Sequence, residues 1–301
     1  MKRTFPRLGL GAGWRPELAL LLEQRADLGF VELIAEDFWA ERSVPVAVEV
    51  LRERGVAVIP HGLSLSLGGA DLPSHAGLDA LGRLARRVDA PLVSEHLAFV
   101  RAGGLESGHL LPLPRTREAL EIVVRNVRAA QAVLPVPLAL ENIATLFEWP
   151  GAEMSEAHFI GEVLERTDAL LLLDLANLYA NGLNHGTDAV EFFSCLPLDR
   201  IAYVHMAGGV IDADGLYHDT HAHALPAPVL ALLRQLCARA QPPGVMIERD
   251  DRFPPDKVFN AELDAVAEIL GAEARGVFRN DEIFSAPTPA LPRERGREYS
   301  R

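Results

Sequence analysis

The chain has 301 residues, of which 49% are hydrophobic, and it carries a formal net charge of −13. A chain of this length can bury a large core, and its acidic balance without a dominant Lys/Arg block argues against a nucleic-acid partner. Residues 1–10 lack the apolar stretch of a signal peptide, and no apolar run is long enough for a membrane span. We therefore expect a cytoplasmic protein with no membrane segment.

The cysteine content limits the chemistry of any metal site. The two cysteines, Cys195 and Cys237, form no CxxC pair and no disulfide framework, so we interpret both as reduced and structural. A metal site in this chain must be built from His, Asp, Glu and Asn. Such donors suit Zn, Mn or Fe and not a sulfur cluster.

Short apolar runs alternate with longer amphipathic segments along most of the chain. Eight of the runs are rich in Val, Ile, Leu or Ala, which is typical of parallel strands buried on both faces. The predicted strands, in chain order, are Leu8–Gly13, Phe30–Glu36, Val56–Gly62, Pro91–Leu97, Pro137–Asn142, Ala169–Leu175, Arg200–Met206 and Gly244–Asp250. The predicted helices between them are Pro16–Asp27, Val44–Arg54, His75–Val88, Thr116–Leu134, Ser155–Arg166, Ala189–Leu196 and Ala227–Ala240.

Residues at the segment boundaries agree with this division. Thr116 and Ser155 stand where helix N-caps are expected, and Gly29 and Gly55 stand between a helix and a strand, where a left-handed C-cap is expected. Eight strands alternating with helices predict one closed (β/α)₈ TIM barrel, with an open doubly wound sheet as the alternative. The glycines of Gly9–Gly13 lack the spacing of a dinucleotide fingerprint, which disfavours that alternative.

The repeating pattern fades near the C-terminus. We expect a metal-binding barrel over residues 1–270 and a C-terminal extension over residues 271–301, whose end is rich in Pro, Arg, Glu and Ser. That composition is typical of a flexible tail.

Polar residues stand at or near the ends of most predicted strands. The carboxyl ends of barrel strands open on one mouth, so these side chains converge, and several carboxylates in one pocket repel each other unless cations lie between them. Each residue alone is more simply explained as a core histidine or a helix cap, but the set predicts a metal site. Its members are Glu32, Glu36, Asp37, His61, Glu95, His96, Glu141, Asn142, Asp174, Asn177, His205, Glu248, Asp250 and Asp251, with His218, Asp219, His221 and His223 in the loop after the seventh strand.

Three members have a more specific expected role. Glu141 is a candidate shared ligand, because one carboxylate can bridge two cations. Glu95 and Asn142 are candidates for holding the second ring nitrogen of a histidine ligand.

A series of motifs in fixed order closely resembles the multinuclear non-heme iron-dependent oxidative enzymes, the family of the methanobactin biosynthesis protein B. The resemblance spans about residues 8 to 270. The motifs are Pro60–Gly69 (PHGLSLSLGG), Ser94–Ala98 (SEHLA), Leu111–Pro114 (LPLP), Glu141–Asn142, Leu172–Tyr179 (LLDLANLY), Asn184–Gly186 (NHG), Val204–Gly208 (VHMAG), Asp219–His221 (DTH) and Ile247–Glu248.

The resemblance implies a xylose-isomerase-like barrel with two or three irons in mixed Fe(II)/Fe(III) states and O₂ as co-substrate. It implies oxidative modification of a ribosomally made precursor peptide, at Cys or a C-terminal residue, in natural-product biosynthesis, with a partner protein that binds the leader peptide. Glu141, Asp174 and His205 would be catalytic. The matching motifs give the metal ligands as His61, His96, Glu141, Asp174, Asn177, His205, Asp219, His221 and Glu248, with Asn177, Asp219 and His221 serving an additional iron.

Three segments depart from the family's pattern. His205–Gly209 reads HMAGG where the family has HLAGH, Ile247–Asp250 reads IERD for IEWD, and Glu36–Phe38 reads EDF for ENY. These changes spare most ligand positions and alter the pocket walls, so they concern the substrate more than the metal.

Two other classes of protein also fit the sequence. The first is a redox-neutral metal barrel, either an isomerase using Mn or Mg, or an endonuclease-IV-like hydrolase using Zn and a basic groove, which the acidic charge disfavours. The second is a non-catalytic metal-binding or partner-binding barrel.

Overall fold

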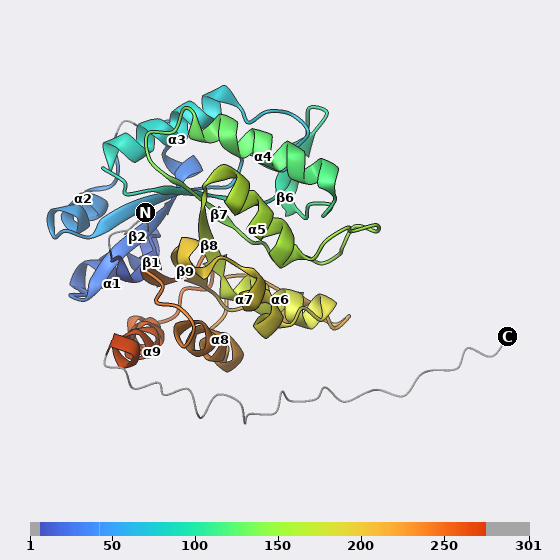
Figure 1. The fold of residues 1–301 in the computed structure, drawn as a ribbon. Coiled ribbons are helices and arrows are strands. Elements are labelled where there is room, and N and C mark those ends of the chain that lie inside the picture. The colour runs from blue at the N-terminus through green and yellow to red at the C-terminus, as the bar shows by residue number, and fades with distance from the viewer. Residues whose placement is uncertain (1–6, 42, 275–301) are drawn as a thin grey trace, which may run out of the picture.

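Eight parallel strands close into a barrel in the computed structural model, which describes residues 7–41 and 43–274 (Figure 1). Successive barrel strands are neighbours, and the last pairs with the first. Each predicted strand overlaps an observed one, so the predicted (β/α)₈ barrel is confirmed. The barrel strands are β1 (Gly9–Gly13), β2 (Leu28–Ile34), β3 (Ala57–Gly62), β4 (Val93–His96), β7 (Leu138–Glu141), β8 (Leu170–Asp174), β9 (Ile201–Met206) and β12 (Gly244–Ile247).

Helices surround the barrel on the outside (Figure 1). All the predicted helices are present, although the first is divided into a 3₁₀ turn and a short α-helix. The elements are η1 (Pro16–Leu18), α1 (Ala19–Gln24), η2 (Ala35–Phe38), α2 (Val46–Glu53), α3 (His75–Arg87), α4 (Arg117–Gln131), α5 (Glu156–Thr167), α6 (Leu175–His185), α7 (Ala189–Cys195), η3 (Leu198–Arg200), α8 (Ala227–Cys237) and α9 (Asp256–Ala274). Among the described residues, no helix is both long and apolar enough to cross a membrane.

Several elements have no counterpart in the sequence prediction. Helix α6 begins immediately at the end of β8, without a linker, and α9 continues past residue 270 to Ala274. Residues 275–301 of the predicted extension lie outside the described residues. Two small antiparallel hairpins also follow barrel strands: β5 (Phe99–Ala102) with β6 (Leu105–Leu111), and β10 (Val210–Ile211) with β11 (Tyr217–His218).

The boundary residues have different roles from one another. Thr116 and Ser155 are N-caps whose hydroxyl groups accept hydrogen bonds from the third residue of the following helix, and Gly55 has a positive φ of 85° after α2. The prediction for Gly29 is wrong, because this glycine lies inside β2. A Cβ at Gly29 would stand 1.8 Å from the carbonyl oxygen of Leu8. Close approach of two backbones, and not a left-handed turn, therefore requires glycine there.

The inward faces of the strands determine where the polar residues gather. Side chains alternate between the two faces of a strand, so every second residue points into the barrel. The lower layers of the interior are mainly apolar and include Phe30, Ile59, Ala139, Leu172 and Met246. The next inward position on each of these strands, two residues further on, holds a polar side chain: Glu32, His61, Glu141, Asp174 and Glu248.

The surroundings of Gly29 and Gly55 predict different costs for their substitution by alanine. Gly29→Ala must separate β1 from β2 and should lower the free energy of unfolding by about 3 kcal/mol or more. Gly55→Ala meets no atom within 4 Å and should cost only about 1 kcal/mol through its positive φ. Urea unfolding followed by circular dichroism measures both. Equal urea midpoints for the two variants would contradict this account.

Candidate metal centre

Histidines and carboxylates from six barrel strands meet at the carboxyl-terminal mouth. Strand pairing brings them to the same level: His96 of β4 is in register with Glu141 of β7, and Asp174 of β8 is in register with His205 of β9. His61 is the second-last residue of β3, and Glu248 directly follows β12. All six side chains are buried: His61, His96, Glu141, Asp174, His205 and Glu248.

One group of donor atoms centres on an oxygen of Glu141. His61 Nε2 lies 3.3 Å and His96 Nε2 lies 3.4 Å from Glu141 Oε2. Two donors that share an ion at about 2.1 Å, with about 90–110° between the bonds, stand about 3.0–3.4 Å apart. The three side chains therefore have the spacing of ligands of one metal ion.

A second group surrounds Nδ1 of His205. This nitrogen lies 3.5 Å from Glu141 Oε1, 3.8 Å from Asp174 Oδ2 and 3.2 Å from Glu248 Oε2. Glu141 thus presents one oxygen to the first group and the other to the second. This arrangement agrees with its expected role as a shared ligand.

A third group adds the loop after β9. His221 Nδ1 lies 3.4 Å from Glu248 Oε2, and Asp174, His221 and Glu248 together could hold an ion. His221 is already hydrogen-bonded, through Nε2 to Asp219 and through Nδ1 to Asp250 at 3.0 Å. Asp219 and His221 therefore lie at the edge of the centre.

Several buried donor atoms of the centre have no hydrogen-bond partner among the residues that the structure describes. These atoms are Glu141 Oε2, Asp174 Oδ2, His205 Nδ1 and Asp219 Oδ1. A buried polar atom without a partner is costly, and such atoms are rare in folded proteins. Nitrogen and oxygen donors with these spacings fit divalent metal ions.

The two asparagines near the centre have different roles. Asn177 Nδ2 lies 3.4 Å from Glu141 Oε1 and donates to the carbonyl oxygen of Asn142 at 2.9 Å, so Asn177 lies beside Glu141. Asn142 does not hold a histidine ring. Its side chain exchanges two hydrogen bonds with the backbone of Asp174, at 3.0 and 2.9 Å, and so joins the ends of β7 and β8.

The partners that orient the histidine rings differ from those expected. Glu95 accepts a hydrogen bond from the backbone N–H of Leu65 at 3.2 Å and contacts the loop after β3. The second nitrogen of His96 faces the carbonyl oxygen of Gly62 at 3.2 Å. His61 and His205 instead contact Ser94 and Glu32, at 2.8 and 2.9 Å.

Burial and mutual repulsion disfavour charge on part of the centre. Burial raises the pKa of Glu141 to about 8 and that of Asp174 to about 7. Burial lowers the pKa of His96 to about 4, and burial together with His96 and His205 lowers the pKa of His61 well below its ordinary value. Both of these histidines are therefore neutral near pH 7 and can offer a lone pair to a metal.

Other members of the centre carry charge because they neutralise one another. Burial opposes protonation of His205, but Glu32, Glu141 and Glu248 outweigh it and hold the pKa of His205 well above its ordinary value. Burial also opposes ionisation of Glu248, yet His221 and His205 hold its pKa well below the ordinary range. Protonated histidines thus supply positive charge that a bound cation would otherwise supply.

One residue of the centre was not predicted from the sequence. Arg15, just before η1, is buried; its guanidinium forms an ion pair with Asp250 and lies 3.3 Å from Glu248 Oε1. It directs one carboxylate oxygen of Glu248 away from His205 and His221. Nothing in the sequence around Arg15 distinguishes it from a surface arginine.

A cavity of about 800 Å³ opens above the metal-facing atoms. His96, Glu141 and His221 lie among its lining residues, together with apolar side chains of β6 and of the loop after β7. Leu146 and Phe147 of that loop are also exposed to solvent.

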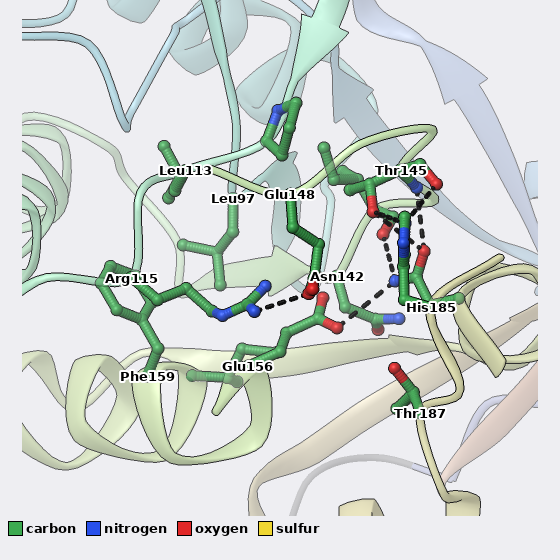
Figure 2. A pocket seen from close by; sticks show the side chains of 14 residues that line it. Leu97, Leu113, Arg115, Asn142, Thr145, Glu148, Glu156, Phe159, His185 and Thr187 are labelled. Atoms are coloured by element: carbon green, nitrogen blue, oxygen red, sulfur yellow. Dashed lines mark hydrogen bonds and ion pairs between the residues drawn. The ribbon is translucent and has the colours of Figure 1, made fainter. Parts of the chain in front are cut away.

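A separate cavity of about 40 Å³ has Asn142 among its lining residues. Figure 2 shows Arg115 and Glu156 at one end and Thr145 and His185 at the other. Arg115 pairs with Glu148 at 2.6 Å, and Asn181 Nδ2 lies 3.3 Å from Glu156 Oε2. Burial raises the pKa of Glu156 to about 7, although Arg115 opposes this shift.

Two departures from the family's motif have structural causes here. Gly209 stands where the family pattern has His, and a Cβ there would lie 2.2 Å from the carbonyl oxygen of His218. The β10–β11 hairpin therefore excludes a larger residue. Arg249, in place of Trp, is buried and pairs with Glu262 at 2.9 Å.

The fold and the centre define a class: a (β/α)₈ barrel with several His/carboxylate groups at its mouth that could hold metal ions. Residues 9–271 match the family model described as "RiPP precursor modification enzyme MbnB/TglH/ChrH", and the chain belongs to this family. The resemblance seen in the motifs is thus confirmed.

Relatives and solved structures agree with this assignment. A UPF0276 protein of Streptomyces avermitilis is 50% identical over 275 residues, which cover 89% of this chain but 56% of the relative, so the chain spans about half of that protein's length. A UPF0276 protein of Caulobacter vibrioides is 39% identical over 271 residues, covering 89% of this chain and 96% of the relative.

The solved structures show the fold. An L-ribulose 3-epimerase has a TM-score of 0.56 at 14% identity, over 92% of this chain and 100% of that one. A fusion protein of a xylose isomerase-like TIM barrel and 4-hydroxyphenylpyruvate dioxygenase has a TM-score of 0.58 at 14% identity, over 95% of this chain and 47% of that one. The predicted xylose-isomerase-like barrel is therefore confirmed.

A metal ion that neutralises the centre should stabilise the folded chain. Adding Co²⁺ or Zn²⁺ at about 100 times its dissociation constant to chelator-treated protein should raise Tm by about 5–10 °C. His96→Ala should reduce this rise, whereas His75→Ala, an exposed histidine on α3, should not. A rise that is the same in both variants would place the ions elsewhere. Differential scanning calorimetry makes the measurement.

The raised pKa of Glu156 predicts a pH dependence of stability. The folded chain favours the protonated carboxyl, so this contribution is complete below about pH 4.5 and is lost as the pH rises through about 7. Between pH 5 and pH 8, the free energy of unfolding of the wild type should fall by about 2 kcal/mol relative to Glu156→Gln. Urea titrations at both pH values test this, and parallel pH profiles would contradict it.

Proposed function

We propose that this chain holds two or three iron ions and uses O₂ to oxidise a ribosomally made precursor peptide, at Cys or a C-terminal residue. The observation that carries the proposal is the sharing of carboxylates between neighbouring donor groups. Glu141 belongs to two of them, and so does Asp174. A single ion would leave several buried donor atoms without a partner.

The donor groups assign ligands to separate ions. His61, His96 and Glu141 would hold one ion, and Glu141, Asp174 and His205 a second. A third ion would lie near Asp174, His221 and Glu248, with Asp219 and Asn177 at its edge. Iron in mixed Fe(II)/Fe(III) states suits imidazole and carboxylate donors and supplies one-electron chemistry with O₂ that side chains lack.

The protein's own contribution is placement and exclusion of water. Glu141, Asp174 and His205 are the residues we assign to catalysis, because all three lie where the donor groups join. Their burial keeps bulk water from the metal-facing atoms, and Asn142 fixes the strand ends that carry Glu141 and Asp174. Rigid placement of this kind is what an enzyme adds to the chemistry of its metals.

The mouth supports a peptide as substrate. The cavity of about 800 Å³ has walls from β6 and from the loop after β7, and its apolar surface continues outward to the exposed Phe147. The family's description as precursor-modifying enzymes agrees with such a substrate. We further propose that a separate, leader-binding protein delivers the peptide and that the reaction takes place in the cytoplasm.

The direct test is an assay with iron-loaded protein and a candidate precursor peptide, with mass spectrometry of the product. The peptide should change mass only when both iron and O₂ are present. Glu141→Ala should lower the rate by more than about a hundredfold. Substituting residues that only orient metal ligands already lowers metal affinity or activity by about 10–100-fold. Glu156→Gln removes a carboxylate outside the centre and should keep the activity.

Two outcomes would contradict the proposal. Turnover without O₂ by Mn- or Zn-loaded protein would favour a redox-neutral isomerase or hydrolase. Loss of metal in Glu141→Ala with no change in any peptide product would favour a non-catalytic metal-binding barrel.

A further inference from the structure

Three buried polar side chains lie directly beneath the metal-facing atoms, and none of them is among the proposed ligands. They are Glu32 on β2, Ser94 on β4 and Tyr203 on β9. At most 1% of each residue is exposed to solvent. Buried polar groups inside an apolar barrel are retained only when they satisfy one another or serve a site.

The three side chains form a continuous series of short contacts between two histidines. His61 Nδ1 lies 2.8 Å from Ser94 Oγ, and Ser94 Oγ lies 2.7 Å from the hydroxyl of Tyr203. That hydroxyl lies 2.5 Å from Glu32 Oε2, which is 2.9 Å from His205 Nε2.

The number of hydrogens determines the direction of every bond in the series. Tyr203 donates its hydroxyl hydrogen to Glu32 Oε2, and the same oxygen accepts from His205 Nε2. The phenol has one hydrogen, which is then used, and it must accept from the hydroxyl of Ser94. Ser94 in turn accepts from His61 Nδ1. When a ring carries a single hydrogen, that hydrogen is therefore on the nitrogen that faces away from the mouth, and a bound cation takes the place of the second proton that His205 carries without metal.

We propose that the chain Glu32–Tyr203–Ser94 is a positioning device that fixes the tautomers of His61 and His205. It leaves a lone pair on His61 Nε2 and on His205 Nδ1, the two nitrogens that face Glu141 at 3.3 and 3.5 Å. This inference rests on the metal centre proposed above. It adds that one hydrogen-bond chain prepares ligands of two different ions.

Packing holds the chain in place independently of its hydrogen bonds. The ring of Tyr203 stands edge-on to Phe30, with centroids 5.6 Å apart, and its centroid lies 5.4 Å from that of the His205 ring. Tyr203→Phe therefore keeps the ring and removes only the hydroxyl. This substitution interrupts the series of hydrogen bonds without opening a large cavity.

Glu32 could instead be a ligand, because Glu32, His205 and Glu248 also come close enough to hold an ion. That ion would use His205 Nε2, whose hydrogen the chain directs to Glu32. Within the described part of the chain, His205 Nδ1 is the ring nitrogen without a hydrogen bond. The geometry therefore favours Nδ1 as the metal-binding atom and Glu32 as the residue that orients the ring.

Substitutions at two points of this hydrogen-bond chain should cause different defects in metal binding. Tyr203 and His205 both contact Glu32 Oε2. Glu32→Gln replaces this charged acceptor with a neutral amide, which holds the hydrogen of His205 Nε2 less firmly, so it should weaken the ion at Glu141, Asp174 and His205 by about 10–100-fold. Tyr203→Phe leaves the Glu32–His205 contact intact. It should chiefly weaken the ion at His61, His96 and Glu141, by a similar factor.

The experiment is a titration of chelator-treated protein with Co²⁺, read by the visible absorption of bound cobalt, with anomalous diffraction at limiting Co²⁺ to give the occupancy of each position. The proteins are wild type, Glu32→Gln, Tyr203→Phe and the control Glu156→Gln. Thermal unfolding of the metal-free proteins accompanies each titration. The expected result is a loss at one position in each variant, different for the two, and none in the control.

Each other outcome has a distinct meaning. If the wild type binds no Co²⁺ at the mouth, the proposed metal centre itself is wrong. If the wild type binds and both variants keep wild-type occupancy at both positions, the positioning role is overturned. An equal loss of cobalt occupancy at every position, together with a lower Tm, would mean that Glu32, Tyr203 and Ser94 only stabilise the fold. Cobalt bound directly to Glu32 would make it a ligand.

Discussion

The structure depends on the electrostatic balance of buried carboxylates at the barrel mouth. Glu32, Glu141, Asp174 and Glu248 are all nearly inaccessible to solvent and lie around one histidine, His205. Carboxylates this close and this buried cannot all stay charged without nearby positive charge. Without metal, protonated histidines and Arg15 supply part of it, and other carboxyl groups become neutral. Cations at the donor groups would balance the carboxylate charges without these changes in protonation.

The alternation of side chains along a strand explains why these groups meet. Each strand places apolar side chains deep in the barrel and a polar side chain at the next inward position. The same strand thus contributes both to the core and to the site. Glu32 and Tyr203 lie at the boundary between these layers, where the interior changes from apolar packing to ligands, and they connect the two.

Much of this arrangement could be predicted from the sequence, because it follows from local pattern. Apolar runs indicated all eight barrel strands, and polar residues at their ends indicated the residues that converge. Contacts between distant segments could not be predicted in this way. Gly29 was interpreted as a helix C-cap because its close contact, the carbonyl oxygen of Leu8, belongs to a distant segment just before β1. Helix α6 was missed because its N-cap, Asp174, is also the last residue of β8.

The most direct test of the central claim is metal analysis, combined with Mössbauer spectroscopy, of protein produced with iron and purified without oxygen. We predict two or more irons per chain whose spectra show magnetic coupling, because Glu141 faces two donor groups at once. A single isolated ion per chain, or a protein that binds zinc or manganese and excludes iron, would contradict the account.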